Sequence, residues 1–192
     1  MTSSTSLFAR LAGAVLSALT SRTPRSPERE PGRTAAHVGT AASRGDAEPT
    51  PGREPGSETL RVDPQDVHDV RIGYAPARDG APDAGEIIWT WVPYEENDGR
   101  GKDRPVLVIG RHGPDRAYAV RMTSRPHDGD RDYLAIGSGR WDAQGRESWV
   151  DIEQLYSVHD DGMRREAAVL ARDRYIVIAS ALTRRYGWRN GG

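Results

Sequence analysis

The sequence predicts a mainly β domain with one C-terminal helix, preceded by a long N-terminal extension without a core. From Gly85 onward, short runs alternate apolar with polar residues, and this alternation is typical of half-buried strands. Before Gly85 the chain is rich in Pro, Gly, Ser and Ala and holds few large apolar side chains. The 192 residues therefore allow one small domain with tails.

We expect residues 1–60 to form a disordered tail, because such a polar segment cannot offset the entropy cost of ordering by burying apolar surface. Within it, residues 7–19 carry apolar side chains at helical spacing, which predicts a short amphipathic helix. That run is too short to span a bilayer, so we expect a cytoplasmic chain with no membrane partner. A targeting or surface-associated role for this helix stays open. Residues 61–84 are expected to be an extended lead-in to a domain at 85–190.

The strands of the domain are predicted from β-branched and aromatic runs. They are expected at 86–92, 105–110, 116–124, 133–137 and, as one strand or two, 148–158. The polar stretch 93–104 is expected to be a loop. Several short antiparallel strands followed by a helix indicate a small barrel or a strongly bent sheet.

The C-terminal helix is predicted from apolar residues three and four apart, namely Ile176, Ala179, Leu182 and Tyr186. Asp173 is the expected cap, and Gly187 the expected end.

The tryptophans divide by their neighbours in the sequence. Trp89 and Trp91 share one face of a strand, so we assign them to a core or a dimer interface. Trp141 and Trp149 flank a polar loop, and they are the better candidates for stacking on bases.

Composition excludes several kinds of site. The chain has no Cys, which removes disulfides, thiol nucleophiles and Cys-ligated zinc. Gly-rich phosphate loops and common hydrolase motifs are missing, and the five His residues show no metal-binding spacing. We therefore expect no cofactor and no metal. With a formal charge of −1, any nucleic-acid binding must come from a local patch.

Three blocks of the sequence resemble the PemK/MazF family of type II toxin–antitoxin endoribonuclease toxins: Gly85–Trp89, Arg104–Ile109 and Met122–Ser124. The resemblance covers residues 85–188. It implies a small SH3-like barrel of PemK/MazF type, usually a homodimer, that cuts single-stranded RNA without a metal. It also implies a cognate antitoxin as partner.

The resemblance places the family's catalytic Arg at Arg104 and its catalytic Thr at Thr123, with Ser124 as a plausible helper. Their chemistry fits this use. A guanidinium can grip two phosphoryl oxygens, and RNA supplies its own tethered nucleophile, the 2′-OH.

The general base stays open between Glu95, Glu96 and His127. RNA binding or sequence preference is expected from Glu95, Glu96, Arg100, Lys102, Arg125 and His127. Asp103 is placed to pair with Arg104 or Lys102, which would weaken the local positive potential. The alternative function is a degenerate barrel that binds protein or nucleic acid and no longer cuts.

Overall fold

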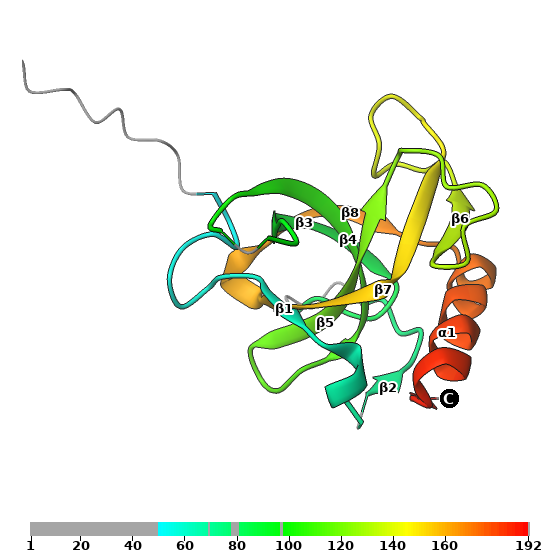
Figure 1. Cartoon of the computed structure of the whole chain (residues 1–192), viewed down its shortest axis with the longest axis horizontal. Helices are drawn as coiled ribbons and strands as arrows, with labels where there is room; N and C mark the ends of the chain where they lie inside the picture. The colour runs from blue at the N-terminus through cyan, green and yellow to red at the C-terminus, as the bar shows by residue number, and fades with distance from the viewer. Residues whose placement is uncertain (1–49, 69, 78–80, 97, 192) are drawn as a thin grey trace, which may run out of the picture. The chain divides into compact units, whose positions relative to one another are not determined.

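The computed structural model describes residues 50–68, 70–77, 81–96 and 98–191 (Figure 1). All of them belong to one compact unit, Arg44–Gly192. The helix expected at 7–19 and the tail up to residue 49 lie outside the described residues.

A seven-stranded sheet dominates the unit, in the order β1-β7-β5-β4-β3-β8 with β6 also paired to β7. Its strands are antiparallel, which confirms the predicted mainly β class. The strands are β1 (Leu60–Val62), β3 (Glu86–Pro93), β4 (Gly101–Arg111), β5 (Arg116–Thr123), β6 (Tyr133–Gly137), β7 (Ser148–His159) and β8 (Arg164–Val169).

Smaller elements complete the unit. The two-residue strands β2 (Arg71–Ile72) and β9 (Arg189–Asn190) pair in parallel. Short 3₁₀ turns occur at η1 (Pro64–Asp66) and η2 (Asp160–Gly162), and the helix α1 spans Arg172–Tyr186.

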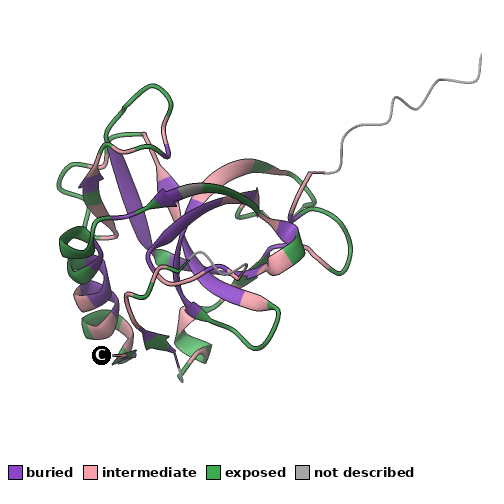
Figure 2. Ribbon diagram, turned by 180° about the vertical axis from the view of Figure 1, so that it is seen from behind, coloured by how far each residue is buried: buried purple, intermediate pink, exposed green. Residues whose placement is uncertain are grey.

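The strongly curved sheet separates two apolar clusters, and its strands are the most buried part of the molecule (Figure 2). The larger cluster fills the space between the sheet and α1, where the Tyr175 hydroxyl donates to the Ile109 carbonyl at 3.2 Å. The smaller cluster includes Ile88, Val106, Ala119 and Tyr156. We call the side of the strands that carries this smaller cluster the inner face.

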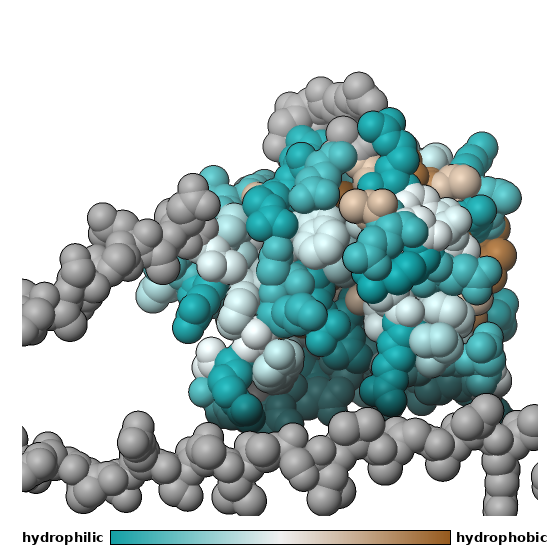
Figure 3. Space-filling model, turned by 90° about the horizontal axis from the view of Figure 1, so that it is seen from above, coloured by the Kyte–Doolittle hydropathy of each residue, from teal (hydrophilic) through white to brown (hydrophobic). Residues whose placement is uncertain are grey.

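The surface is largely polar. The side drawn in Figure 3 is mostly hydrophilic, and its apolar atoms gather toward the part of the molecule where Figure 1 draws α1. On α1, Ile176 and Val177 are 50% and 57% exposed.

The helix differs from its prediction in register. Gly187 ends it in the left-handed conformation, as predicted, with φ 72°. Ala171 is the N-terminal cap, and Asp173 lies in the first turn instead. Ile176 faces outward because the helix turns Tyr175 and Ile178 into the core.

The tryptophans are buried to different extents from those predicted: Trp89 and Trp91 are not core residues, and Trp141 and Trp149 are. Trp89 and Trp91 are only half-buried, since β3 turns Ile88, Thr90 and Val92 inward. Arginines cover them: the guanidinium carbons of Arg164 and Arg53 lie 5.8 and 4.9 Å from the two ring centroids. Trp141 and Trp149 are each only 5% exposed, so the prediction that they stack on bases is wrong.

Residues 50–62 pack against the strands, unlike the unpacked tail that the composition of residues 50–60 predicts. Strand β1 pairs with β7, and the Trp91 amide on β3 donates to the Pro51 carbonyl at 3.0 Å. The buried Thr90 hydroxyl donates to the Gly162 carbonyl and also meets the Thr59 hydroxyl, both at 2.6 Å. Polar and backbone contacts hold this segment, and contacts of this kind leave no apolar pattern in the sequence.

We expect Gly52→Ala to release this segment and to lower the free energy of unfolding by about 2–4 kcal/mol. Gly52 has φ +83°, and an added Cβ would lie 2.7 Å from the Thr59 hydroxyl and closer still to that of Thr90. Gly56→Ala is the matched control, because Gly56 has φ +91° but nothing within 4 Å of its added Cβ. Urea unfolding measures both variants; equal losses would show that the close approach is unimportant.

Candidate active site

The inner face changes from apolar to polar along two adjacent strands. On β4 it runs from Val106 to Arg104, and on β5 it runs from Ala119 through Arg121 to Thr123, because alternate residues share a face. The last paired residues of these strands are Val106 and Arg121. Beyond that pair the strands are no longer hydrogen-bonded, and the same register continued by two residues would bring Arg104 and Thr123 to facing positions.

Arg104 lies within β4, which begins at Gly101, and not at the end of a loop as expected. The predicted loop is shorter because residues 101–104 pair with the end of β3. The Arg104 Nε atom is buried and has no hydrogen-bond partner within the described residues.

Asp103 does not pair with Arg104 or Lys102. It accepts a hydrogen bond from Arg164 on β8 at 2.7 Å, because successive side chains of a strand point to opposite faces. The expected weakening of the positive charge at Arg104 by a direct Asp103 contact is therefore absent from the described structure.

Thr123 ends β5, and its hydroxyl oxygen accepts the Arg125 amide hydrogen at 3.1 Å. The hydroxyl proton of Thr123 remains free to donate to a further acceptor. Ser124 is half-buried beside it, and Arg125 is exposed.

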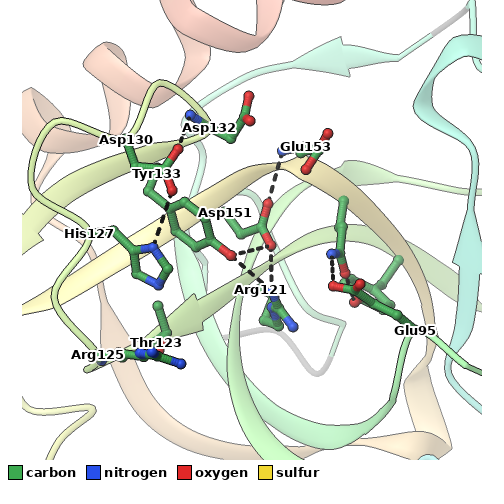
Figure 4. A network of polar contacts seen from close by, with 12 residues as sticks. Glu95, Arg121, Thr123, Arg125, His127, Asp130, Asp132, Tyr133, Asp151 and Glu153 are labelled. Carbon is green, nitrogen blue, oxygen red and sulfur yellow. Dashed lines mark hydrogen bonds and ion pairs between the residues drawn. The ribbon is translucent and has the colours of Figure 1, made fainter.

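A network of polar contacts among Arg121, Tyr133 and Asp151 lies near Thr123 (Figure 4). Arg121 donates through Nη2 to Asp151 Oδ2 at 2.6 Å and to the Tyr133 hydroxyl at 3.1 Å. The Tyr133 hydroxyl in turn donates to Asp151 Oδ2 at 3.3 Å. Burial, with a further contribution from Asp151, raises the pKa of Tyr133, so this phenol stays neutral at ordinary pH.

His127 joins this network through an aromatic contact. Its ring stacks on Tyr133 with centroids 3.5 Å apart and planes within 9°. Its Nδ1 atom lies 3.4 Å from Asp130 Oδ2.

Glu95 belongs to a second branch of polar contacts. Gln154 donates to Glu95 Oε1 at 2.8 Å and accepts from the Tyr156 hydroxyl at 2.6 Å. Burial raises the pKa of Tyr156, which also stays neutral. Glu95 thereby lines a groove of about 530 Å³, whose other walls are residues 61–65, the centre of β7 and the end of α1.

The remaining predicted binding residues are exposed: Glu96 and Arg100 lie between β3 and β4, and Lys102 lies at the start of β4. Arg100 is held by Asp98 at 2.7 Å, and Lys102 lies beside Val92 in the strand pairing. No contact of Glu96 with Arg104 or Thr123 occurs in the part of the chain that is described.

The sequence profile of the PemK-like, MazF-like toxins of type II toxin–antitoxin systems matches residues 83–185. This chain belongs to that family. The match covers β3 through nearly all of α1, and it includes all the catalytic and RNA-binding residues predicted above. The segment 50–62 that packs beside β3 and β7 lies outside the match.

Solved structures of related folds include an endoribonuclease in complex with its cognate antitoxin from a mycobacterial species, which is 16% identical with a TM-score of 0.44. That similarity covers 56% of this chain and 96% of the other. MazE–MazF and MazF structures from Deinococcus radiodurans are each 20% identical with TM-scores of 0.44, and cover 57% of this chain and 98% and 99% of theirs. No curated protein sequence matches the chain.

Sequence reasoning missed Arg121, Asp151 and Tyr133. A signal for Arg121 exists, because RAYAVRMT sets an arginine in line with Ala117 and Ala119 on the apolar side of the strand. An arginine at such a position needs a partner or a ligand. Asp151 and Tyr133 carry no comparable signal, since only the pairing of β6 with β7 brings them to Arg121.

Two further findings concern the described residues alone. They contain no helix long and apolar enough to cross a membrane. They also contain no group of three or more His, Asp or Glu side chains arranged to hold a metal ion.

Proposed function

We propose that this PemK/MazF toxin is an endoribonuclease that cuts single-stranded RNA between Arg104 and Thr123. The observation that supports the proposal is the pairing of Val106 with Arg121, because the same register continued by two residues would bring Arg104 and Thr123 to facing positions. A buried Arg104 Nε without a partner, together with the free hydroxyl proton of Thr123, gives this position donors for a phosphate group.

The reaction follows from these groups. The 2′-oxygen of the RNA attacks the adjacent phosphorus, and the bond from phosphorus to the 5′-oxygen breaks. The products are a 2′,3′-cyclic phosphate and a 5′-hydroxyl, which takes up a proton. Arg104 stabilises the negative charge that builds on the phosphoryl oxygens, and Thr123 donates to one of those oxygens. No step in this scheme uses a metal ion.

His127 is the group we propose to accept the 2′-OH proton, because histidine is the side chain that most often serves as a general base. Its stacking on Tyr133 ties it to the charged network beside Thr123. Glu95 faces the groove instead, held by Gln154, so we assign it to sequence preference.

We expect His127→Asn to lower kcat by about 10²–10⁴. Glu95→Gln should leave kcat nearly unchanged and alter which sequences are cut. Cleavage rates, together with sequencing of the fragments, measure both effects. A large loss of rate in Glu95→Gln, and not in His127→Asn, would reverse the two assignments.

The proposal also includes two protein partners. One is an antitoxin that inhibits the enzyme, and the other is a second copy of the chain, which forms a homodimer. Exposed Ile176 and Val177 on α1 offer apolar surface for such contacts. Expression of the full chain should arrest growth, and co-expression of the cognate antitoxin should restore it. Sedimentation of the purified chain at micromolar concentration tests the dimer.

The second candidate function is a barrel that binds RNA without cutting it. It would be favoured if the full chain bound single-stranded RNA and arrested growth while the RNA stayed intact.

A further inference from the structure

Arg121 carries a charge that the proposed reaction does not use. Its side chain is 17% exposed, and that of its partner Asp151 is 1% exposed. Burying such a pair is costly, and apolar residues of the same volume often serve stability equally well or better. Stability therefore gives no good reason for an Arg–Asp pair on the inner face of β5.

The contacts of Arg121 leave part of its guanidinium unused. Both of its hydrogen bonds leave from Nη2. Its Nε atom is buried and, like that of Arg104, finds no partner in the described residues. A buried donor without a partner destabilises the folded chain, and here two of them occur on neighbouring strands.

The strand register relates these two arginines directly. Arg121 pairs with Val106, and Arg104 lies two residues further along the same face of β4. In a paired sheet such diagonal neighbours lie about 7–8 Å apart, within reach of long side chains. A single anion that reaches both guanidinium groups would be attracted by both charges and could accept hydrogen bonds from each.

We propose that Arg121 and Arg104 together bind one phosphodiester group, with Asp151 and Tyr133 holding Arg121 in position. RNA as the ligand rests on the proposed function, while the phosphodiester site itself rests on the two arginines. Arg121 is then a phosphate-binding residue, and Asp151 is a positioning residue.

Salt dependence of binding separates this role from a structural one. The probe is a fluorescent single-stranded DNA 12-mer of random sequence, which has phosphates but no 2′-OH and is not cut. For single strands, log Kd changes with log salt concentration by about 0.7 for each phosphate contact. The full chain is compared with Arg121→Gln and Arg121→Lys, and with Arg111→Gln as control. Arg111 lies at the other end of β4, paired with Asp160 at 3.1 Å.

We expect Arg121→Gln to reduce this slope by about 0.7, and Arg121→Lys to retain it because the charge is kept. Arg111→Gln should match the wild type. An unchanged slope in Arg121→Gln would overturn the proposal. If Arg121→Gln does not fold, the variant R121Q/D151N removes both charges while keeping an amide pair, and the same loss of slope is expected.

The result is independent of cleavage. If the wild type cuts no RNA but Arg121→Gln loses slope, the phosphodiester site stands and the proposed enzyme fails. If RNA is cut through Arg104 while Arg121→Gln keeps its slope, the enzyme stands and the role of Arg121 fails.

Discussion

Arg104→Gln is expected to lower the single-turnover rate of RNA cleavage by about 10²–10³, the usual cost of removing one preorganised donor to a developing negative charge. Glutamine keeps the length and polarity of the side chain but loses the charge and the two-pronged donor. Because the Arg104 Nε has no hydrogen-bond partner in the described structure, its loss breaks no contact seen there. The free energy of unfolding should therefore fall by less than about 1 kcal/mol.

Lys102→Gln is the control for charge alone. Lys102 lies on the same face of β4, two residues before Arg104, and is exposed. We expect its rate to fall less than about tenfold at moderate salt, because an exposed cation contributes mainly a screened attraction. Equal losses of cleavage rate in the two variants would show that only the net positive charge of the site matters for cleavage.

Asp151→Ala is expected to lower the free energy of unfolding by about 3–5 kcal/mol, because it leaves the buried Arg121 charge without its partner. Asp151 also accepts the Glu153 amide at 3.0 Å through its other oxygen. Urea unfolding of the full chain measures the loss. The partly exposed pair Arg111–Asp160 gives the control, where Asp160→Ala should cost no more than about 1 kcal/mol.

A double variant separates stability from function in this network. Replacing the pair by apolar residues, Arg121→Met with Asp151→Leu, should restore most of the lost stability, while phosphate binding stays impaired. If the double variant were as unstable as Asp151→Ala, the ion pair itself would be needed for folding, and the assignment of Arg121 to phosphate would lose its energetic argument.

Much of the fold was predictable from local sequence. The strands β3, β5, β6 and β7 occur where β-branched and aromatic runs predict them, and Gly187 ends the helix where expected. β8 was not predicted, because RREAAV has three charged residues and is held in the sheet by pairing with β3. Residues 50–62 were missed for a similar reason, since hydroxyl and backbone contacts hold them.

The candidate site was predictable only in part. Arg104 and Thr123 were predicted from the family resemblance, and they follow the last paired residues, Val106 and Arg121, by two positions on their strands. Arg121 was predictable from its own strand, because it is a charged residue on the face that otherwise carries Ala117 and Ala119. Asp151 and Tyr133 come from strands far along the chain, and no local pattern predicts that they meet.

The central claim is that this toxin cuts single-stranded RNA by attack of the 2′-OH at the site formed by Arg104 and Thr123. Its most direct test is the end chemistry of RNA incubated with the purified full chain and excess chelator, without antitoxin. We predict fragments with a 2′,3′-cyclic phosphate and a 5′-hydroxyl, and no fragments with Arg104→Gln over the same time. Intact RNA with the wild type, or fragments with 5′-phosphate ends, would contradict the claim.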